Sequence, residues 1–316
     1  MRTLWNWLPN TVDARVSFFA WASLVSQIVI IGTGGAVRLT GSGLGCPTWP
    51  QCTAESYVTT PEMGLHGVIE FANRLLTFVL VLIAIGMFLM VVRQRLERPE
   101  LLRLSVALGL GIPGQAVIGG ITVLTDLNPY VVGLHYLLSA VLVGLAAILL
   151  YRVRVGRSGG SPIVPGAFTA TLRVLLLALA LSVVMGIITT GSGPHAGDGG
   201  AARNGLNSEL LQHIHAWPSY AVFGLSVIAL SWSLRLLAAR LRRTLVAIVA
   251  VVLTQIAIGL FQARNGLPEL AVGIHMVLAS VIVALVVSAL LATREEVPAQ
   301  GSAGRQRRQE TAASNS

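Results

Sequence analysis

Long apolar stretches alternate with short polar connections along almost the whole chain. Eight stretches are each long enough for one helical crossing of a bilayer core, which needs roughly 20 apolar residues. Since backbone polar groups cannot stay unpaired in lipid, each stretch is predicted to be a helix. The eight predicted helices cover residues 16–38, 63–92, 104–124, 131–151, 172–191, 209–234, 244–262 and 270–292.

The composition agrees with a membrane protein. Apolar residues make up 54% of the chain and charged residues only 11%, and the mean hydropathy is +0.75, which lies outside the range of soluble domains. The net charge of +9 comes from arginines that crowd alternate connections. The positive-inside rule therefore predicts cytoplasmic termini, and this alternation explains the charge without a nucleic acid partner. We expect a multi-pass protein of a bacterial inner membrane, with its first apolar stretch retained rather than cleaved as a signal peptide.

An internal repeat divides the chain. Residues 115–135 align without gaps on residues 255–275, and the identical pairs include Gln115 with Gln255, Gly119 with Gly259 and His135 with His275. Because each half has an even number of helices, both halves enter the membrane from the same side. We predict an all-α polytopic membrane protein in which eight transmembrane helices form two parallel-repeat four-helix bundles. Their bounds are 1–155 and 156–293, and a disordered cytoplasmic tail is expected at 294–316.

Four histidines are expected inside membrane helices, where an unpaired histidine is costly. His135 and His275 occupy equivalent places in the repeat, while His66 and His215 lie near the starts of the second and sixth predicted helices. All four are therefore predicted close to one face of the membrane. Two histidines on facing helices at one depth can bind a haem iron from both sides, although a hydrogen bond to a neighbouring helix is the alternative for each. Zinc is disfavoured, because it needs three or four closely spaced ligands, so iron held through haem is the expected metal.

Glu70 is the other costly residue in a predicted helix. His66, Glu70 and Asn73 share one helix face at positions i, i+4 and i+7. Arg74 is adjacent in space on such a helix and would neutralise the carboxylate. In the alternative interpretation, Glu70 handles protons beside a reacting group.

Three further residues lie in predicted periplasmic loops. Cys46 and Cys52 are the only two cysteines, and an oxidising compartment favours a disulfide between them. Such a bridge in a short loop is either structural or redox-active, and the structural role is favoured. His195, in the loop TGSGPHAGD, is predicted to be a loop or haem propionate contact rather than an iron ligand.

The sequence resembles the haem A synthase family, which converts haem O to haem A for terminal oxidases. The resemblance extends over all eight helices and is carried by GCPTWPQC, GQAVIGGITVLTDLNPYVVGLH, NGLPELAVGIH and LLQHIHAW. It implies a haem-dependent membrane oxidoreductase that oxidises one methyl group of haem O to a formyl group, through successive hydroxylation and loss of water. The implied partners are membrane lipid, haem O, the synthase that makes it and an unidentified electron acceptor; homo-oligomerisation stays open.

The same resemblance assigns site residues. It implies that His215 and His275 bind the iron of a haem b cofactor, and that His135 binds the iron of the haem O substrate. It also implies that Glu70 is the catalytic carboxylate of a Glu-x-x-His-Arg pattern, with Arg74 as a candidate haem contact. Asn73 occupies the histidine position of that pattern. The second ligand of the substrate iron is therefore either His66 or no residue.

Two rival functions remain at this point. A dihaem b-type electron-transfer protein would hold two permanent haems and would not need Glu70. A secondary transporter would also have duplicated halves, but it would bind no haem.

Overall fold

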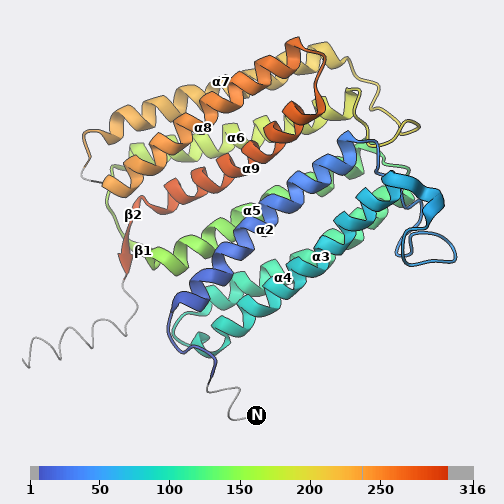
Figure 1. The fold of residues 1–316 in the computed structure, drawn as a ribbon. Helices are drawn as coiled ribbons and strands as arrows, with labels where there is room; N and C mark the ends of the chain where they lie inside the picture. The colour runs from blue at the N-terminus through green and yellow to red at the C-terminus, as the bar shows by residue number, and fades with distance from the viewer. Residues whose placement is uncertain (1–6, 237, 298–316) are drawn as a thin grey trace, which may run out of the picture.

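Eight long apolar helices form most of the protein (Figure 1). The computed structural model describes residues 7–236 and 238–297. Within these residues, all eight helices are long and apolar enough to cross a membrane, so the predicted all-α, multi-pass fold is confirmed. The helices are α2 (Ala14–Leu39), α3 (Gly64–Val91), α4 (Pro99–Leu124), α5 (Pro129–Val155), α6 (Gly166–Ser192), α7 (Ser208–Ser233), α8 (Ala239–Arg264) and α9 (Glu269–Leu291).

The helices pack as two groups of four. In the first half, α2 packs against α3 and α5, and α4 packs against both α3 and α5. In the second half, α6 packs against α7 and α9, and α8 packs against both α7 and α9. The two groups meet where α9 contacts α2 and α5, and where α5 contacts α6. The helices of the two halves are thus packed together through α2, α5, α6 and α9.

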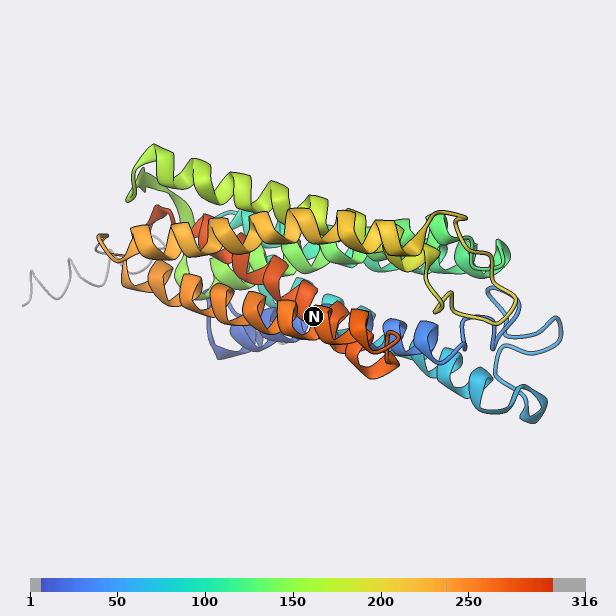
Figure 2. The same ribbon diagram turned by 90° about the horizontal axis from the view of Figure 1, so that it is seen from above.

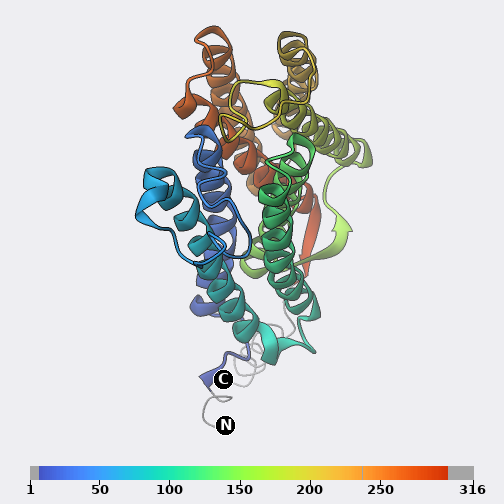
Figure 3. The same cartoon turned by 90° about the vertical axis from the view of Figure 1, so that its right-hand side faces the viewer.

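The two ends of the helix bundle differ (Figures 2 and 3). The long connections 40–63 and 193–207 lie together at one end, which also holds the tight turns 125–128 and 265–268. We call this the loop end, and the opposite end the terminus end. A 3-10 turn, η1 (Pro61–Met63), precedes α3 at the loop end, and a second, η2 (Val92–Gln94), follows α3 at the terminus end.

Apolar packing forms two cores, the first mainly among α2–α5 and the second mainly among α6–α9, and Val283 of α9 packs against both. Phe168 is fully buried in the second core, where its ring meets the edge of Trp232 at 5.5 Å between centroids. On the same helix, Leu177 is 68% exposed. Exposed apolar side chains of this kind form the surface that faces lipid, because the helices have far more apolar area than their neighbours cover.

A short sheet at the terminus end was not predicted. Strand β1 (Arg157–Pro162) pairs antiparallel with β2 (Arg294–Val297). The expected disordered tail at 294–316 therefore begins with a strand, and its remaining residues, 298–316, lie outside the described residues.

Replacing Phe168 with alanine should test the second core. The empty space left by the ring should lower the free energy of unfolding by about 3–5 kcal/mol, measured by thermal unfolding of the purified protein in detergent. Leu177→Ala on the same helix is the matched control, and we expect it to change the unfolding temperature little. Equal effects of both substitutions would contradict the assignment of Phe168 to a packed core.

Candidate functional site

The rings of His215 on α7 and His275 on α9 face each other inside the second half. Their centroids lie 6.3 Å apart, and the ring planes are inclined at 71°. Two metal–nitrogen bonds of about 2 Å each, with about 1 Å from each nitrogen to its ring centre, place two ligating imidazoles about 6 Å apart. The observed separation therefore fits one metal ion held between both rings.

Hydrogen bonds position the two histidines. Nδ1 of His215 lies 3.0 Å from the carbonyl oxygen of Ser182. Because a carbonyl only accepts, Nδ1 carries the proton and Nε2 keeps its lone pair for a metal. The amide of Gln255 donates to the backbone carbonyl of His275 at 3.0 Å, which fixes this turn of α9 against α8.

Glycines create the space for these rings. A β-carbon at Gly186 would lie 3.0 Å from Cε1 of His215, and one at Gly259 would lie 3.2 Å from Cε1 of His275. Each ring therefore lies directly on the backbone of a neighbouring helix. A larger residue at either glycine would push the ring out of the position in which it faces its partner.

His135 on α5 has the same surroundings in the first half. The amide of Gln115 donates to the His135 carbonyl at 3.1 Å, and a β-carbon at Gly119 would lie 3.2 Å from Cε1 of the ring. Nδ1 is buried without a hydrogen-bond partner among the described residues, and Nδ1 of His275 shares this property. A buried polar atom without a partner is costly in a dry interior. A histidine kept there at this cost is a candidate metal ligand, which would bind the metal through its other ring nitrogen, Nε2.

The turns that precede His135 and His275 also match. Asp126 and Leu127 have positive φ angles of 49° and 58°, and Gly266 and Leu267 have 72° and 59°. Leu127 donates its N–H to a carbonyl five residues earlier at 2.8 Å, and Leu267 does the same at 2.9 Å, as in a Schellman motif. Both histidine helices thus start from a turn of one conformation.

Glu70 is buried on α3 beneath the first loop. One carboxylate oxygen accepts the backbone N–H of Cys46, and the other accepts from the guanidinium of Arg74. Arg74 also donates to three loop carbonyls, those of Cys46, Thr48 and Gln51. The ion pair therefore anchors the loop to the helix.

The predicted disulfide between Cys46 and Cys52 is present, and it closes the loop that Arg74 anchors. From this loop, the ring of Trp49 packs directly on the backbone of α4 at Gly120. The neighbouring residue, Gly119, contacts the His135 ring. The anchored loop thus covers the part of the first half in which His135 lies.

His66 and Asn73 make other contacts. Nδ1 of the exposed His66 lies 2.9 Å from the hydroxyl of Ser42, and His66 lines an open pocket of about 540 Å³ at the loop end. The side-chain oxygen of Asn73 accepts a hydrogen bond from Thr33 at 2.8 Å. Among the described hydrogen bonds and ring contacts, neither residue is paired with His135.

His195 lies in the α6–α7 loop. Its Nε2 is 2.8 Å from the carbonyl oxygen of Leu267, to which it must donate. The imidazole therefore holds the turn from which α9 begins, two turns before His275.

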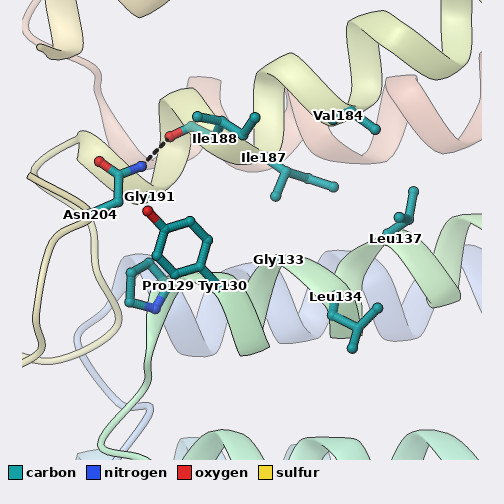
Figure 4. A pocket seen from close by; sticks show the side chains of 10 residues that line it. All are labelled: Pro129, Tyr130, Gly133, Leu134, Leu137, Val184, Ile187, Ile188, Gly191 and Asn204. Atoms are coloured by element: carbon teal, nitrogen blue, oxygen red, sulfur yellow. Dashed lines mark hydrogen bonds between the residues drawn. The ribbon is translucent and has the colours of Figure 1, made fainter. Parts of the chain in front are cut away.

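A second pocket, of about 210 Å³, lies between α5 and α6 (Figure 4). At its loop end, the amide of Asn204 donates to the carbonyl of Ile188 at 2.8 Å. Helical periodicity places this lining on the face of α5 opposite His135, so the pocket is separate from the histidine site. It is lined by Pro129, Tyr130, Gly133, Leu134, Leu137, Val184, Ile187, Ile188, Gly191 and Asn204.

Comparison with known proteins identifies the family. Residues 17–287 match the COX15-CtaA family, described as cytochrome oxidase assembly protein. The chain belongs to the cytochrome oxidase assembly protein family. The match covers all eight helices almost completely, which confirms the resemblance noted from the sequence.

Similar members of this family are named heme A synthase. The Geobacillus thermodenitrificans protein is 24% identical over 139 residues, which cover 44% of this chain and 43% of that protein. The Exiguobacterium sibiricum protein is 25% identical over 187 residues, 59% of this chain and 61% of that protein. A protoheme IX farnesyltransferase of Thermus thermophilus is 32% identical over 81 residues, 25% of this chain and 13% of that protein. The chain spans about half the length of the curated relatives it matches.

Several contacts of these site residues could not be predicted from the sequence. Gly119 and Gly259 are matched in the repeat and signal close packing, but Gly186 carries no such signal. The backbone bond from Cys46 to Glu70 and the packing of Trp49 depend on how the loop folds over α3 and α4, which no sequence period records.

Removing the Arg74 anchor should expose the disulfide. In Arg74→Met, the loop carbonyls lose a charged donor, so local opening should become about tenfold or more frequent. The rate at which a maleimide labels the two cysteines under mild reduction should rise accordingly. Arg264→Met, at an exposed position at the loop end, is the control, and equal labelling rates in both variants and the parent would contradict the anchor.

Proposed function

We propose that the protein is a haem A synthase, which oxidises a methyl group of haem O to a formyl group. The observation that carries the proposal is the pair of rings of His215 and His275, whose centroids lie 6.3 Å apart. Family membership and the names of the relatives support the activity. Haem supplies the redox chemistry when it is bound, and the protein supplies ligation, orientation and proton handling.

The second half is the proposed haem b site. His215 and His275 would hold the iron, since the His215 ring is oriented by Ser182 and the two rings lie at the separation that one iron requires. Gly186 and Gly259 let the rings approach. A bis-histidine iron suits electron transfer to or from a second site.

The first half is the proposed substrate site, with His135 as the ligand of the haem O iron. The matched positions of Gln115 and Gly119 support this role, because they surround His135 as Gln255 and Gly259 surround His275. The same match supports the proposal that the halves are parallel repeats. His66 is exposed and bound to Ser42, so we propose that His135 is the only protein ligand on this side.

Glu70 is the proposed catalytic carboxylate. It lies under the loop that reaches Gly120, next to the His135 environment. Arg74 and the Cys46 N–H hold both oxygens in place, so that Glu70 can exchange a proton from a defined position. Arg74 thereby acts on the site through Glu70 and the loop.

The loop end is the proposed periplasmic side. Arginines concentrate in the connections at the terminus end, which the positive-inside rule places in the cytoplasm. A disulfide at the loop end fits an oxidising compartment. The proposed partners are the synthase that supplies haem O and an electron acceptor.

Alanine at His215 or His275 should remove haem b. Because each variant lacks one of the two proposed iron ligands, it should bind haem b less tightly. The Soret absorbance per protein of the purified variant should therefore fall sharply. The control is His213→Ala, which changes an exposed histidine two residues from His215. Haem content that stays unchanged in both ligand variants would exclude the haem b site.

Glu70→Gln should separate binding from catalysis. The variant should keep haem b but lower haem A production by about 100-fold or more, as loss of a general acid–base group does. Haem A is measured by chromatography of extracted pigments after co-expression with a haem O source. Glu62→Gln, at an exposed loop position, is the control; normal haem A accumulation in Glu70→Gln would refute the catalytic role.

A further inference from the structure

Two arginines from different halves meet at the loop end. Arg38, at the end of α2, donates to the carbonyls of His195 at 2.7 Å and Thr190 at 3.0 Å. Arg203, in the α6–α7 loop, donates to the carbonyl of Pro194 at 2.7 Å and to that of Ala201. The carbonyls of two adjacent residues, Pro194 and His195, therefore accept from the two guanidinium groups, which are near enough for their charges to interact.

Neither arginine has a carboxylate partner. Arg15, Arg74 and Arg98 are paired with carboxylates, and neither Arg38 nor Arg203 is so paired within the part of the chain that the structure describes. Asp198, the acidic residue of the same loop, instead accepts the N–H of Gly200 at 2.9 Å. Carbonyls satisfy donors but leave the charges unbalanced, so two adjacent cations form a site for an anion.

Each guanidinium group has an N–H donor that its described hydrogen bonds do not use. The described bonds of Arg38 use Nε and Nη2, and those of Arg203 use Nη1 and Nη2. Nη1 of Arg38 and Nε of Arg203 therefore remain for a ligand. Arginine donors of this kind suit the planar oxygens of a carboxylate.

The arginine pair lies just beyond the His215–His275 site. Thr190, which accepts from Arg38, is four residues after Gly186 on α6, hence on the same helix face and about 6 Å nearer the loop end. Gly186 is the residue on which the His215 ring lies. From the other side, a β-carbon at Gly273 of α9 would lie 3.3 Å from Leu39, the neighbour of Arg38.

We propose that Arg38 and Arg203 bind the propionate carboxylates of the haem held by His215 and His275. This inference rests on the proposed haem site. Apart from its iron, the macrocycle is apolar, and its two carboxylates are its anionic groups, which must be paired where they leave water. Arg38 from the first half and Arg203 from the second would then hold the two propionates at the loop end of the site.

His195 has a different role in this arrangement. Its imidazole is bound to the Leu267 carbonyl, so only its backbone carbonyl takes part, as the acceptor that positions Arg38. Of the two roles that the sequence suggested for this side chain, a loop contact or a propionate contact, the bond to Leu267 is a loop contact, and it holds the turn before α9.

The test compares haem b with its dimethyl ester, in which both carboxylates are blocked. Full-length protein carrying His135→Ala, prepared from haem-deficient cells, isolates the second-half site, and Soret titration gives the affinity for each probe. The parent should bind haem b about tenfold or more tightly than the ester. In Arg38→Gln and Arg203→Gln, the ratio of the two affinities should fall toward one, whereas Arg38→Lys should keep part of it.

Arg264→Gln is the matched control, an exposed arginine at the same end of the bundle, and should leave the ratio unchanged. The ratio of the two affinities is taken within each variant, so a general loss of stability affects both probes alike. If Arg38→Gln does not fold, the ratio measured for Arg203→Gln decides the test. Equal affinities of the parent for both probes, or an unchanged ratio in the Arg203 variant, would overturn the inference. Binding of neither probe by the parent would instead refute the haem site itself.

Discussion

The architecture depends on imidazole rings that lie directly on glycine backbone inside apolar helix bundles. His215 lies on Gly186, and His275 lies on Gly259, so that α7 and α9 present their rings to each other. An imidazole in such surroundings is costly unless it is bound. The close helix packing around these rings is therefore explained best by a ligand that both histidines share.

The loop end joins the two halves around this site. The N–H of Gly43 donates to the carbonyl of Gly197 at 2.7 Å, and Leu127 packs in a small apolar cluster with Ala196 and Ala201. These contacts connect the first loop, the turn before α5 and the α6–α7 loop. The first loop is in turn held by the buried Glu70–Arg74 pair. A buried ion pair with many hydrogen bonds adds specificity of position more reliably than stability, which suits a loop held in one place over α3 and α4.

The sequence predicted all eight helices because bilayer thickness sets a strong signal of about 20 apolar residues. The helix starts were less accurate: α4 begins at Pro99 and α6 at Gly166, several residues before the predicted starts at 104 and 172. The added residues of α4 include Arg103, whose long side chain can reach the membrane surface, and the added residues of α6, 166–171, include two threonines. The apolar stretch is therefore shorter than the helix at its first residues. The β1–β2 pairing joins segments far apart in the chain and leaves no local pattern.

The candidate site was predictable only where the repeat marks it. His135 and His275, with their matched glutamines and glycines, are equivalent positions of the two repeats. His215 was predicted as the second ligand because a haem iron can take a histidine from a facing helix. His66 shares a helix face with Glu70, yet its position at the exposed first turn of α3 depends on where the loop ends.

The central claim is that His215 and His275 bind one iron. Hyperfine spectroscopy of the ferric protein, labelled with ¹⁵N-histidine and purified without a haem O source, tests it most directly. The account predicts low-spin iron coupled to two axial imidazole nitrogens. Iron coupled to one imidazole nitrogen, or to none, would contradict it.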